Sequence, residues 1–520
     1  MRDVWPRRAM KRLADFVRVH PGRSAVGLIT LASFAIRLNG VNAWSLWDDE
    51  LAEAVVAQLP WNAFFEGVRS HAAGTPLDYL GVKATTFLLG TTTTATRLWA
   101  AACGAAAVAA MAWAAWEVYR SRLIAGVSAT LLAVAPFHVS YSQEARFYAM
   151  ASLVTLVAIG SFARAMRTSR TGDWVLLGFA YAAAVYTHYF AASLAIASVI
   201  AVVLVAGLRL AAHRFKPPHV VYWRRRISGL VVAGVVALAL FSPWLVYAFI
   251  EQMQIIYVGF PQPDPFTADF VAGVLQSLLA PMGGEAVVLQ QAAVVGLTII
   301  LAGVGLRDSK PWKRPAGMLL LLAIVITLPL IWAADLRSGF FFHPRQAIGL
   351  LVVLLLLAGA GLVGTGDRLA RYVRVGGTGR AMAIALLLTA WLGLVSPLVG
   401  RQLHAPWRTH QDWRGAAAFI VERACPESTI YVNLPATYDY GVGYYRSELL
   451  PGTREISGRP LYAQIQSLGL EPSDWIVVRR NHPEVDGEQG LAQIDAITAG
   501  HEMQAHDFPA LRVYAPSVQC

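Results

Sequence analysis

Long apolar runs recur along most of this chain and restrict what it can fold into. An α-helix needs about 20 consecutive, predominantly apolar residues to cross the hydrocarbon core of a bilayer. Of the 520 residues, 56% are hydrophobic and 14% are charged, whereas a soluble protein carries about 25% charged residues. Backbone polar groups inside lipid must be satisfied within the segment, so such runs fold as helices. The sequence therefore predicts a polytopic α-helical membrane protein.

The positions of the apolar runs predict about eleven transmembrane helices by the length criterion. The first covers about 24–38, and the others fall near 97–117, 122–140, 147–166, 173–189, 190–210, 227–249, 286–306, 315–334, 346–364 and 381–400. The segment 76–90 is short and carries Asp78 and Lys83. We interpret it as an interfacial amphipathic helix within the first outer loop, 41–96, and not as a span.

The distribution of Lys and Arg predicts how these helices are oriented. Basic loops recur at 119–122, 164–170, 209–226, 307–314 and 368–380, and in this topology all lie on the same side as the basic N-terminus. Because cytoplasmic loops carry an excess of Lys and Arg, we expect the N-terminus inside the cytoplasm and the C-terminus outside. The N-terminal segment has no small-residue cleavage site and is interpreted as retained. The net charge of +11 then reflects membrane orientation and not nucleic-acid binding.

The residues from about 401 to 520 differ in composition from the transmembrane part, 1–400. Charged residues become more frequent and long apolar runs stop. A helical pattern at 413–423 and strand-like segments at 429–434, 475–480 and about 510–514 predict a small extracytoplasmic α/β domain. Cys425 and Cys520 both lie in it, and two alternatives stay open: a disulfide in an oxidising compartment or two free thiols.

Polar and charged residues gather at the predicted outer ends of the helices and in the outer loops. They are Arg37, Asp48, Asp49, Glu50, His71, Lys83, Arg97, Glu144, Arg146, His188, Asp335, Arg337, His343 and Arg345. Side chains that merely snorkel to the interface would divide between both faces. We therefore expect a polar cavity at the outer interface. The loop 250–285, rich in Pro, Gly and aromatic residues, is a candidate lid over it.

The acidic stretch Asp48, Asp49 and Glu50 follows the first predicted span. Three adjacent carboxylates at a bilayer edge are costly unless they have a function. The alternative is a solvated helix start, because Asp and Glu are favoured in a first helical turn. For Lys83 the alternative is an interfacial anchor, and for Arg97 and Arg37 it is a side chain that snorkels to the interface. These alternatives explain each residue singly, but they do not explain why the polar residues lie on one side.

Several motifs follow one another in order along residues 24 to 200. They are WDDELAEA, HAAGTPLDYLGVKATTFLLG, TRLWAAACG, PFHVSYSQEARFYAM and VYTHYF, with a weaker counterpart at FFHPRQAIGLLVVLL. The series resembles the bacterial membrane glycosyltransferases of the GT-C fold, in particular the glycosyltransferase family 39-like group of protein mannosyltransferase and lipid A aminoarabinose transferase relatives. The resemblance implies a polyprenyl-phosphate sugar as donor. It also implies a lipid, glycan or protein acceptor on the outer face of the bacterial cytoplasmic (inner) membrane.

The resemblance also implies roles for individual residues. The family's first-loop acidic pair falls on Asp49 and Glu50, which makes Asp49 the expected general base, while the additional acid Asp48 is a rival base. The expected substrate-binding residues are His71, Lys83, Arg97, Tyr141, Glu144, Arg146, Tyr148, His188, Tyr189 and Arg345. The family's late arginine falls on Arg345, but Gln346 replaces the aromatic residue that usually follows it.

The expected reaction is an inverting, single-displacement glycosyl transfer. A carboxylate takes the acceptor proton, and Arg345, Lys83 and Arg146 stabilise the charge on the leaving polyprenyl phosphate. No cofactor is certain. The use of a divalent metal stays open: related enzymes differ in it, and the sequence shows no His/Cys ligand spacing.

Two other classes of function compete with this interpretation. A transporter or lipid flippase would have ionisable or broken-helix sites near the bilayer midplane and halves related by repetition, and the sequence shows neither. A non-catalytic glycan or lipid receptor would leave the acidic stretch unexplained. The sequence does not name the sugar, the acceptor, the oligomeric state or the role of the C-terminal domain.

Overall fold

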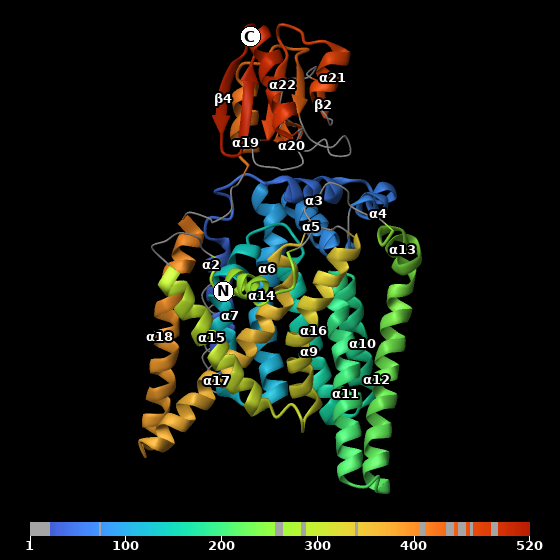
Figure 1. Cartoon of the computed structure of the whole chain (residues 1–520), viewed down its shortest axis with the longest axis vertical. Helices are drawn as coiled ribbons and strands as arrows, with labels where there is room; N and C mark the ends of the chain where they lie inside the picture. Colours follow the sequence, from blue (N-terminus) through green and yellow to red (C-terminus); the bar gives the residue numbers. More distant parts are fainter. Residues whose placement is uncertain are drawn as a thin grey trace, which may run out of the picture. The chain divides into compact units, whose positions relative to one another are not determined.

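The structure is a computed structural model, drawn in Figure 1. It describes residues 21–71, 74–254, 264–281, 288–338, 342–404, 411–432, 441–445, 454–457, 461–479 and 487–520. The chain divides into two compact units, each described by itself. We call Met1–Asn39, Val68–Asp78 and Leu98–Trp407 the helical unit, and Gly40–Gly67, Tyr79–Arg97 and Arg408–Cys520 the sheet unit. Most of the basic N-terminal segment lies outside the described residues.

The helical unit is a bundle of long apolar helices that run alongside one another (Figure 1). Eight described helices are long and apolar enough to cross a membrane. They are α6 (Thr93–Tyr119), α9 (Tyr148–Thr168), α11 (Ala192–Ala212), α12 (Pro217–Trp244), α15 (Val288–Ser309), α16 (Pro315–Ser338), α17 (Ile348–Tyr372) and α18 (Gly377–His404). The bundle also contains α2 (Pro21–Leu38), α8 (Pro136–Tyr141) and α14 (Ala268–Leu279). The predicted class, a polytopic helical membrane protein, is confirmed.

Two of the expected spans are shorter than the sequence suggested. α7 (Arg122–Ala133) has 12 residues and α10 (Thr171–Val185) has 15. At a rise of 1.5 Å per residue they are about 18 and 23 Å long, against a hydrocarbon core of about 30 Å. α7 stops before Pro136, because the residue ahead of a proline is disfavoured in a helix. Apolar composition alone therefore overestimated their length.

Helices α15 and α17 pack through glycine. A Cβ on Gly361 would lie 1.8 Å from the carbonyl oxygen of Leu301, and a Cβ on Gly305 would lie 1.9 Å from that of Leu357. Only glycine permits this approach, and small residues at helix interfaces are typical of membrane bundles. This packing holds α17, which is almost entirely buried, at the centre of the helical unit.

The segment 41–96, the predicted first outer loop, contains three short helices, α3 (Asp48–Gln58), α4 (Trp61–Ser70) and α5 (Pro76–Leu89). α5 has 14 residues and is about 21 Å long, too short to cross a bilayer without distortion. This length agrees with the prediction that 76–90 is not a span, and its interfacial location stays a prediction.

The sheet unit contains a five-stranded sheet in the order β2-β1-β3-β5-β4. The strands are β1 (Thr429–Val432), β2 (Arg454–Ser457), β3 (Trp475–Arg479), β4 (Gln504–Phe508) and β5 (Leu511–Ala515). β1 pairs in parallel with both β2 and β3, whereas β5 runs antiparallel to β3 and to β4. The predicted small α/β domain is confirmed, with β1, β3 and β5 near their expected positions.

Helices cover both faces of this sheet. α19 (Trp413–Val421) shares a buried apolar cluster with residues of β1, β3 and β5 on one face. α21 (Leu461–Leu468) and α22 (Gly487–Gly500) contribute to a second cluster on the other face. The first cluster also includes Leu46 and Leu51 of the first outer loop, both fully buried. The C-terminal sheet and α3 therefore share one hydrophobic core.

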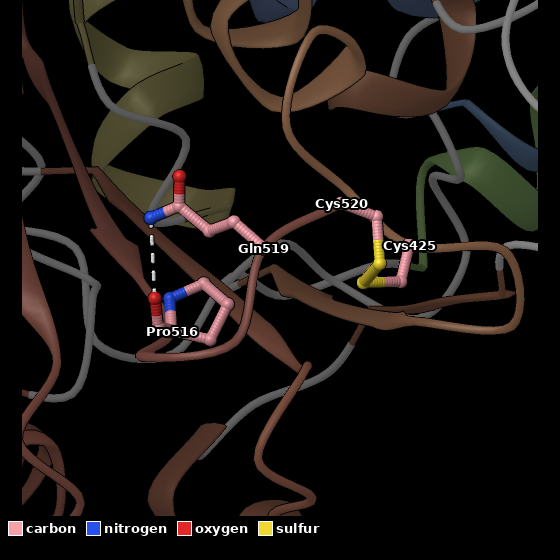
Figure 2. The surroundings of a disulfide bond; sticks show 4 residues. All are labelled: Cys425, Pro516, Gln519 and Cys520. Atoms are coloured by element: carbon pink, nitrogen blue, oxygen red, sulfur yellow. Dashed lines mark hydrogen bonds between the residues drawn. A yellow bond between two sulfur atoms is a disulfide. The ribbon is translucent and has the colours of Figure 1, made fainter.

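Cys425 and Cys520 form a disulfide, which settles the alternative that the sequence left open (Figure 2). It joins residues 95 positions apart and holds the C-terminus beside the end of α19, where the backbone N–H of Cys520 donates to the carbonyl oxygen of Arg423 at 3.0 Å. The side-chain amide of Gln519 donates to the carbonyl oxygen of Pro516 at 3.2 Å (Figure 2). The last residues of the chain are thus fixed to the sheet unit.

We expect Cys520→Ser to lower the free energy of unfolding of the sheet unit by about 2–4 kcal/mol, because the disulfide restricts the unfolded chain. Thermal unfolding of the full chain under non-reducing conditions measures this change. Val518→Ser is the matched control, since Val518 is exposed at the same terminus. Equal unfolding temperatures for the two variants would contradict the prediction.

Candidate functional site

A buried ion pair fixes the start of helix α3 in the sheet unit. Arg97 Nε donates to Glu50 Oε1 at 2.7 Å, and Nη2 donates to Glu50 Oε2 at 2.6 Å. The two side chains are 3% and 1% exposed. The remaining N–H groups of Arg97 donate to the carbonyl oxygens of Val41, Trp44 and Ser45 at 2.8 to 3.0 Å. These contacts occupy all five N–H donors of a guanidinium group.

Asp48 is held by residues of the C-terminal part of the sheet unit. Trp413 Nε1 donates to Asp48 Oδ1 and Gln411 Nε2 donates to Oδ2, both at 3.1 Å. Arg479 forms an ion pair with the same carboxylate. Burial raises the pKa of Asp48 above its ordinary value, although Arg479 and the hydrogen bonds from Gln411 and Trp413 act in the opposite direction.

Asp49 lies between these two anchored carboxylates and is partly exposed. The residues of the acidic stretch therefore have different partners: Glu50 pairs with Arg97, and Asp48 pairs with Arg479. A charge-assisted pair of this kind stabilises the ionised carboxylate and fixes its position. This division favours structural roles for Asp48 and Glu50.

Lys83 closes the other end of helix α3. Its ammonium group donates to the carbonyl oxygen of Ala57 at 2.9 Å and to that of Leu59. It also lies over the rings of Trp61 and Phe64, at 4.8 and 5.0 Å from their centroids. A cation at a helix C-terminus satisfies the last carbonyls and complements the helix dipole. α3 is therefore held by charged partners at both ends.

The predicted substrate-binding residues of the helical unit gather around the start of α9. Tyr141 and Tyr148 pack edge to face with centroids 4.9 Å apart, and Glu144, in the turn between them, is buried. The guanidinium of Arg146 lies 5.1 Å from the Phe147 ring. The guanidinium of Arg345, on the turn Pro344–Ala347 before α17, lies 5.8 Å from the Tyr148 ring.

Two further segments meet this cluster. His188 packs against Phe147, with ring centroids 4.8 Å apart. Beside it, Thr75 donates a hydrogen bond to the carbonyl oxygen of Thr187 at 2.8 Å, so the segment after His71 runs alongside the segment that carries His188. Residues from four distant parts of the sequence thus meet within the helical unit.

Tyr189 and Gln252 hold the segment that contains His71. Tyr189 accepts a hydrogen bond from Trp244 Nε1 at 2.9 Å and donates to Gln252 Oε1 at 2.5 Å. Gln252 Nε2 approaches the carbonyl oxygens of Arg69, His71 and Gly74 at 3.0 to 3.2 Å. No motif in the sequence singled out Gln252, because it is one uncharged amide beside Glu251 at the end of an apolar run.

Gln252 follows a π-helical turn, Leu245–Phe249, an irregularity that is frequent at functional sites. It stands at the start of the predicted lid, 250–285. Much of that loop lies outside the described residues, which include α14 but not 255–263 or 282–287. The lid therefore stays a prediction.

A pocket opens beside this cluster, between α9, α11, α16 and α17. Its lining includes Tyr148, Thr155, His188, Thr327 and Gln346, together with apolar residues of the four helices. The Gln346 side chain is 9% exposed, and its Oε1 accepts no hydrogen bond within the described part of the chain. Gln346, which stands where the resembled family usually has an aromatic residue, thus contributes a hydrogen-bond acceptor to the pocket wall.

Arg37 serves the end of a helix. It is fully buried, and its guanidinium donates to the carbonyl oxygen of Ala133 at 3.1 Å and contacts His138 Nδ1 at 2.7 Å. It also donates to the carbonyl oxygen of Ser33 at 3.0 Å. Because α7 ends at Ala133, these contacts cap α7 with a cation.

Among the described residues, no group of three or more His, Cys, Asp or Glu side chains is placed so that it could hold a metal ion. In the acidic triplet, Arg97 and Arg479 already supply positive charge to Glu50 and Asp48.

No family model matches the chain, and no curated protein matches it in sequence. Solved structures do match it in fold. The apo crystal structure of ArnT from Cupriavidus metallidurans has a TM-score of 0.60 and 15% identity, and covers 94% of this chain and 97% of that chain. The same protein bound to undecaprenyl phosphate gives a TM-score of 0.57 at 16% identity, with the same coverage.

A more distant match is the archaeal oligosaccharyltransferase AglB from Archaeoglobus fulgidus, in complex with an inhibitory peptide and a dolichol-phosphate. It has a TM-score of 0.53 and 12% identity, and covers 96% of this chain and 75% of that chain. The matches extend over both units of the chain. The chain therefore has the GT-C fold, as its motif series implied.

Proposed function

We propose that this protein is a membrane glycosyltransferase that moves a sugar from a polyprenyl-phosphate donor to an acceptor on the outer face of the cytoplasmic membrane. One observation carries the proposal: Arg345 lies against Tyr148, and Tyr148 and Gln346 both line the pocket between apolar helices. An arginine is suited to a phosphate, and apolar walls are suited to a lipid chain. The fold is shared with ArnT bound to undecaprenyl phosphate and with AglB in complex with a dolichol-phosphate.

In this proposal Asp49 is the general base. Its carboxylate takes the proton of the acceptor hydroxyl or amine while the acceptor atom attacks the anomeric carbon. The bond from that carbon to the phosphate oxygen breaks, and polyprenyl phosphate leaves with the electron pair. Attack opposite the leaving group inverts the anomeric configuration.

The cationic side chains divide into two groups in the same proposal. Arg345 and Arg146 stabilise the charge that develops on the phosphate. Arg97 and Lys83 hold helix α3, because their donors are directed at Glu50 and at backbone carbonyls. His71, His188 and Tyr189 line or support the donor site, and Tyr141 and Glu144 support the turn before α9.

We further propose that the N-terminus is cytoplasmic and the sheet unit extracytoplasmic, in the inner membrane of a bacterium. The disulfide between Cys425 and Cys520 supports this placement, since disulfides persist in oxidising compartments. Within the helical unit, the turn between α11 and α12 and the turn between α17 and α18 lie at the same end of the bundle (Figure 1). Both turns are basic, as cytoplasmic loops are.

We expect Arg345→Gln to lower the rate of sugar transfer about 10²–10³-fold, because it removes a cation that stabilises transition-state charge. Arg345→Lys should retain part of the rate. Arg337→Gln is the matched control, since Arg337 is exposed at the end of α16. The assay follows transfer from undecaprenyl phosphate that carries a radiolabelled hexose or pentose, in proteoliposomes.

Two results would contradict the proposal. If Arg345→Gln transferred sugar as fast as Arg337→Gln, Arg345 would not hold the phosphate. If the wild-type protein moved the labelled lipid across the bilayer without transferring its sugar, the protein would be a transporter.

A further inference from the structure

Arg479 lies at the edge of the C-terminal sheet where the parallel strands end. It is the last residue of β3, at the carboxyl end of the parallel strands. β1 lies between β2 and β3, so the chain leaves β1 toward one edge of the sheet and leaves β3 toward the other. Such a switch point, at the carboxyl ends of the strands, is where open α/β sheets bind their ligands.

In this protein the position where such a ligand would bind is occupied by a side chain of the protein itself, the carboxylate of Asp48. The Asp48 carboxylate forms an ion pair with Arg479 and accepts hydrogen bonds from Trp413 and Gln411. The contact also includes the backbone, because the N–H of Asp48 donates to Gln411 Oε1 at 3.2 Å. The first turn of α3 is therefore bound in the manner of a carboxylate ligand.

The residues just before α3 are bound to the same part of the chain. Ser45 Oγ donates to Asp412 Oδ1 at 2.9 Å and accepts from the backbone N–H of Arg414 at 3.0 Å. The backbone N–H of Leu46 donates to the hydroxyl of Tyr445 at 2.7 Å. Leu46 itself is fully buried in the apolar cluster formed with α19 and the sheet. These contacts make the C-terminal region part of what fixes the N-terminal end of α3.

We infer that Arg479 is a positioning residue: by holding Asp48 at the switch point of the C-terminal sheet, it sets the orientation of Asp49, the next residue of α3. This inference rests on the proposed function of Asp49. It gives the C-terminal domain a definite role, which is to hold the base-bearing helix in its working position. It also explains the additional acid in this chain as an anchor.

Removing the Arg479 guanidinium would leave the Asp48 carboxylate without its positive partner. The Asp48 side chain is 19% exposed, and a largely buried carboxylate without its counter-charge is strongly unfavourable. The first turn of α3 would then shift toward water, and Asp49 would shift with it. Small displacements of a reacting group cost about 10²-fold in rate. Neutralising Asp48 at the same time removes the reason for the shift.

The experiment compares Arg479→Gln, Arg479→Lys, Asp48→Asn, Asp49→Asn and the double variant Asp48→Asn/Arg479→Gln in the full-length protein. Arg512→Gln is the matched control, because Arg512 lies on β5 of the same sheet and pairs with Asp507. Hydrogen–deuterium exchange of the peptide that covers α3 reports its position without any assay of activity. Transfer kinetics then give kcat and the KM for the donor.

We expect Arg479→Gln to speed exchange in α3 and to lower kcat about tenfold or more, with little change in donor KM. Arg479→Lys should recover part of kcat, and the double variant should return to within about threefold of wild type, since removing both partners of a pair costs less than removing one. Arg512→Gln should match wild type in both measurements.

Two results would overturn the inference. One is exchange in α3 that is the same in Arg479→Gln as in Arg512→Gln. The other is an Asp48→Asn variant as inactive as Asp49→Asn, because Asp48 would then take part in the chemistry. If the wild-type protein transferred no sugar, the proposed function would fall, while the exchange measurement would still decide whether Arg479 holds α3.

Discussion

Asp49→Asn should transfer sugar about 10³-fold more slowly than the wild-type protein, within the range of 10²–10⁴ that a general base contributes. The substitution keeps the size of the side chain and removes its ability to accept a proton. Because Asp48 and Glu50 are anchored by Arg479 and Arg97, α3 should keep its place in this variant. The loss should therefore appear in kcat and not in the amount of folded protein.

The assay is transfer from radiolabelled undecaprenyl-phosphate sugar, with Asp269→Asn as the control. Asp269 is an exposed acid in the first turn of α14, so its replacement should leave the rate unchanged. Undiminished transfer by Asp49→Asn would remove Asp49 from the mechanism. Asp48→Asn tests whether the rival base Asp48 takes part in the reaction. If Asp48 only anchors α3, this variant should lose much less of the transfer rate than Asp49→Asn.

Arg97→Gln should lower the free energy of unfolding of the sheet unit by about 3–5 kcal/mol, the usual cost of removing one partner from a buried ion pair. Glu50 would lose its counter-charge, and the carbonyl oxygens of Val41 and Ser45 would lose their donors. The measurement is the unfolding of the full-length protein by heat or denaturant, together with hydrogen–deuterium exchange of the segment 40–58.

Arg380→Gln is the control for this prediction. Arg380 forms an exposed pair with Asp367, and such surface pairs contribute at most about 1 kcal/mol. The two roles considered for Arg97 give different results. An Arg97→Gln variant as stable as Arg380→Gln but unable to transfer sugar would show that Arg97 contacts the substrate instead of holding the loop.

Much of the fold follows from the sequence because its causes are local. Helix-length apolar runs predicted most of the long helices, and β-branched and aromatic residues predicted β1 and β3. β4 was missed because most of its residues are exposed or half-buried and it lacks an apolar alternation. α7 was given too much length, because apolar residues continue past Ala133, where the helix ends. The end of α10 was also placed too late, past Val185.

The site was harder to predict because its partners are distant in sequence. The motif series predicted that Glu144, Arg146 and Arg345 belong to one site, and their segments do meet in the helical unit, around Tyr148. No pattern indicated that Arg479 would pair with Asp48, because an ion pair between a strand end and a first-loop helix has no periodicity. Composition likewise could not separate an arginine directed at carbonyls, such as Arg97, from one directed at a ligand.

The most direct test of the account is whether purified protein consumes a polyprenyl-phosphate sugar. Undecaprenyl phosphate carrying a radiolabelled hexose or pentose would be incubated in proteoliposomes with envelope extract as acceptor. We expect label to leave the lipid and to appear on an acceptor as free undecaprenyl phosphate accumulates, and we expect Asp49→Asn to slow both changes about 10³-fold. Label that stays on the lipid with every sugar and extract, in the presence of folded wild-type protein, would contradict it.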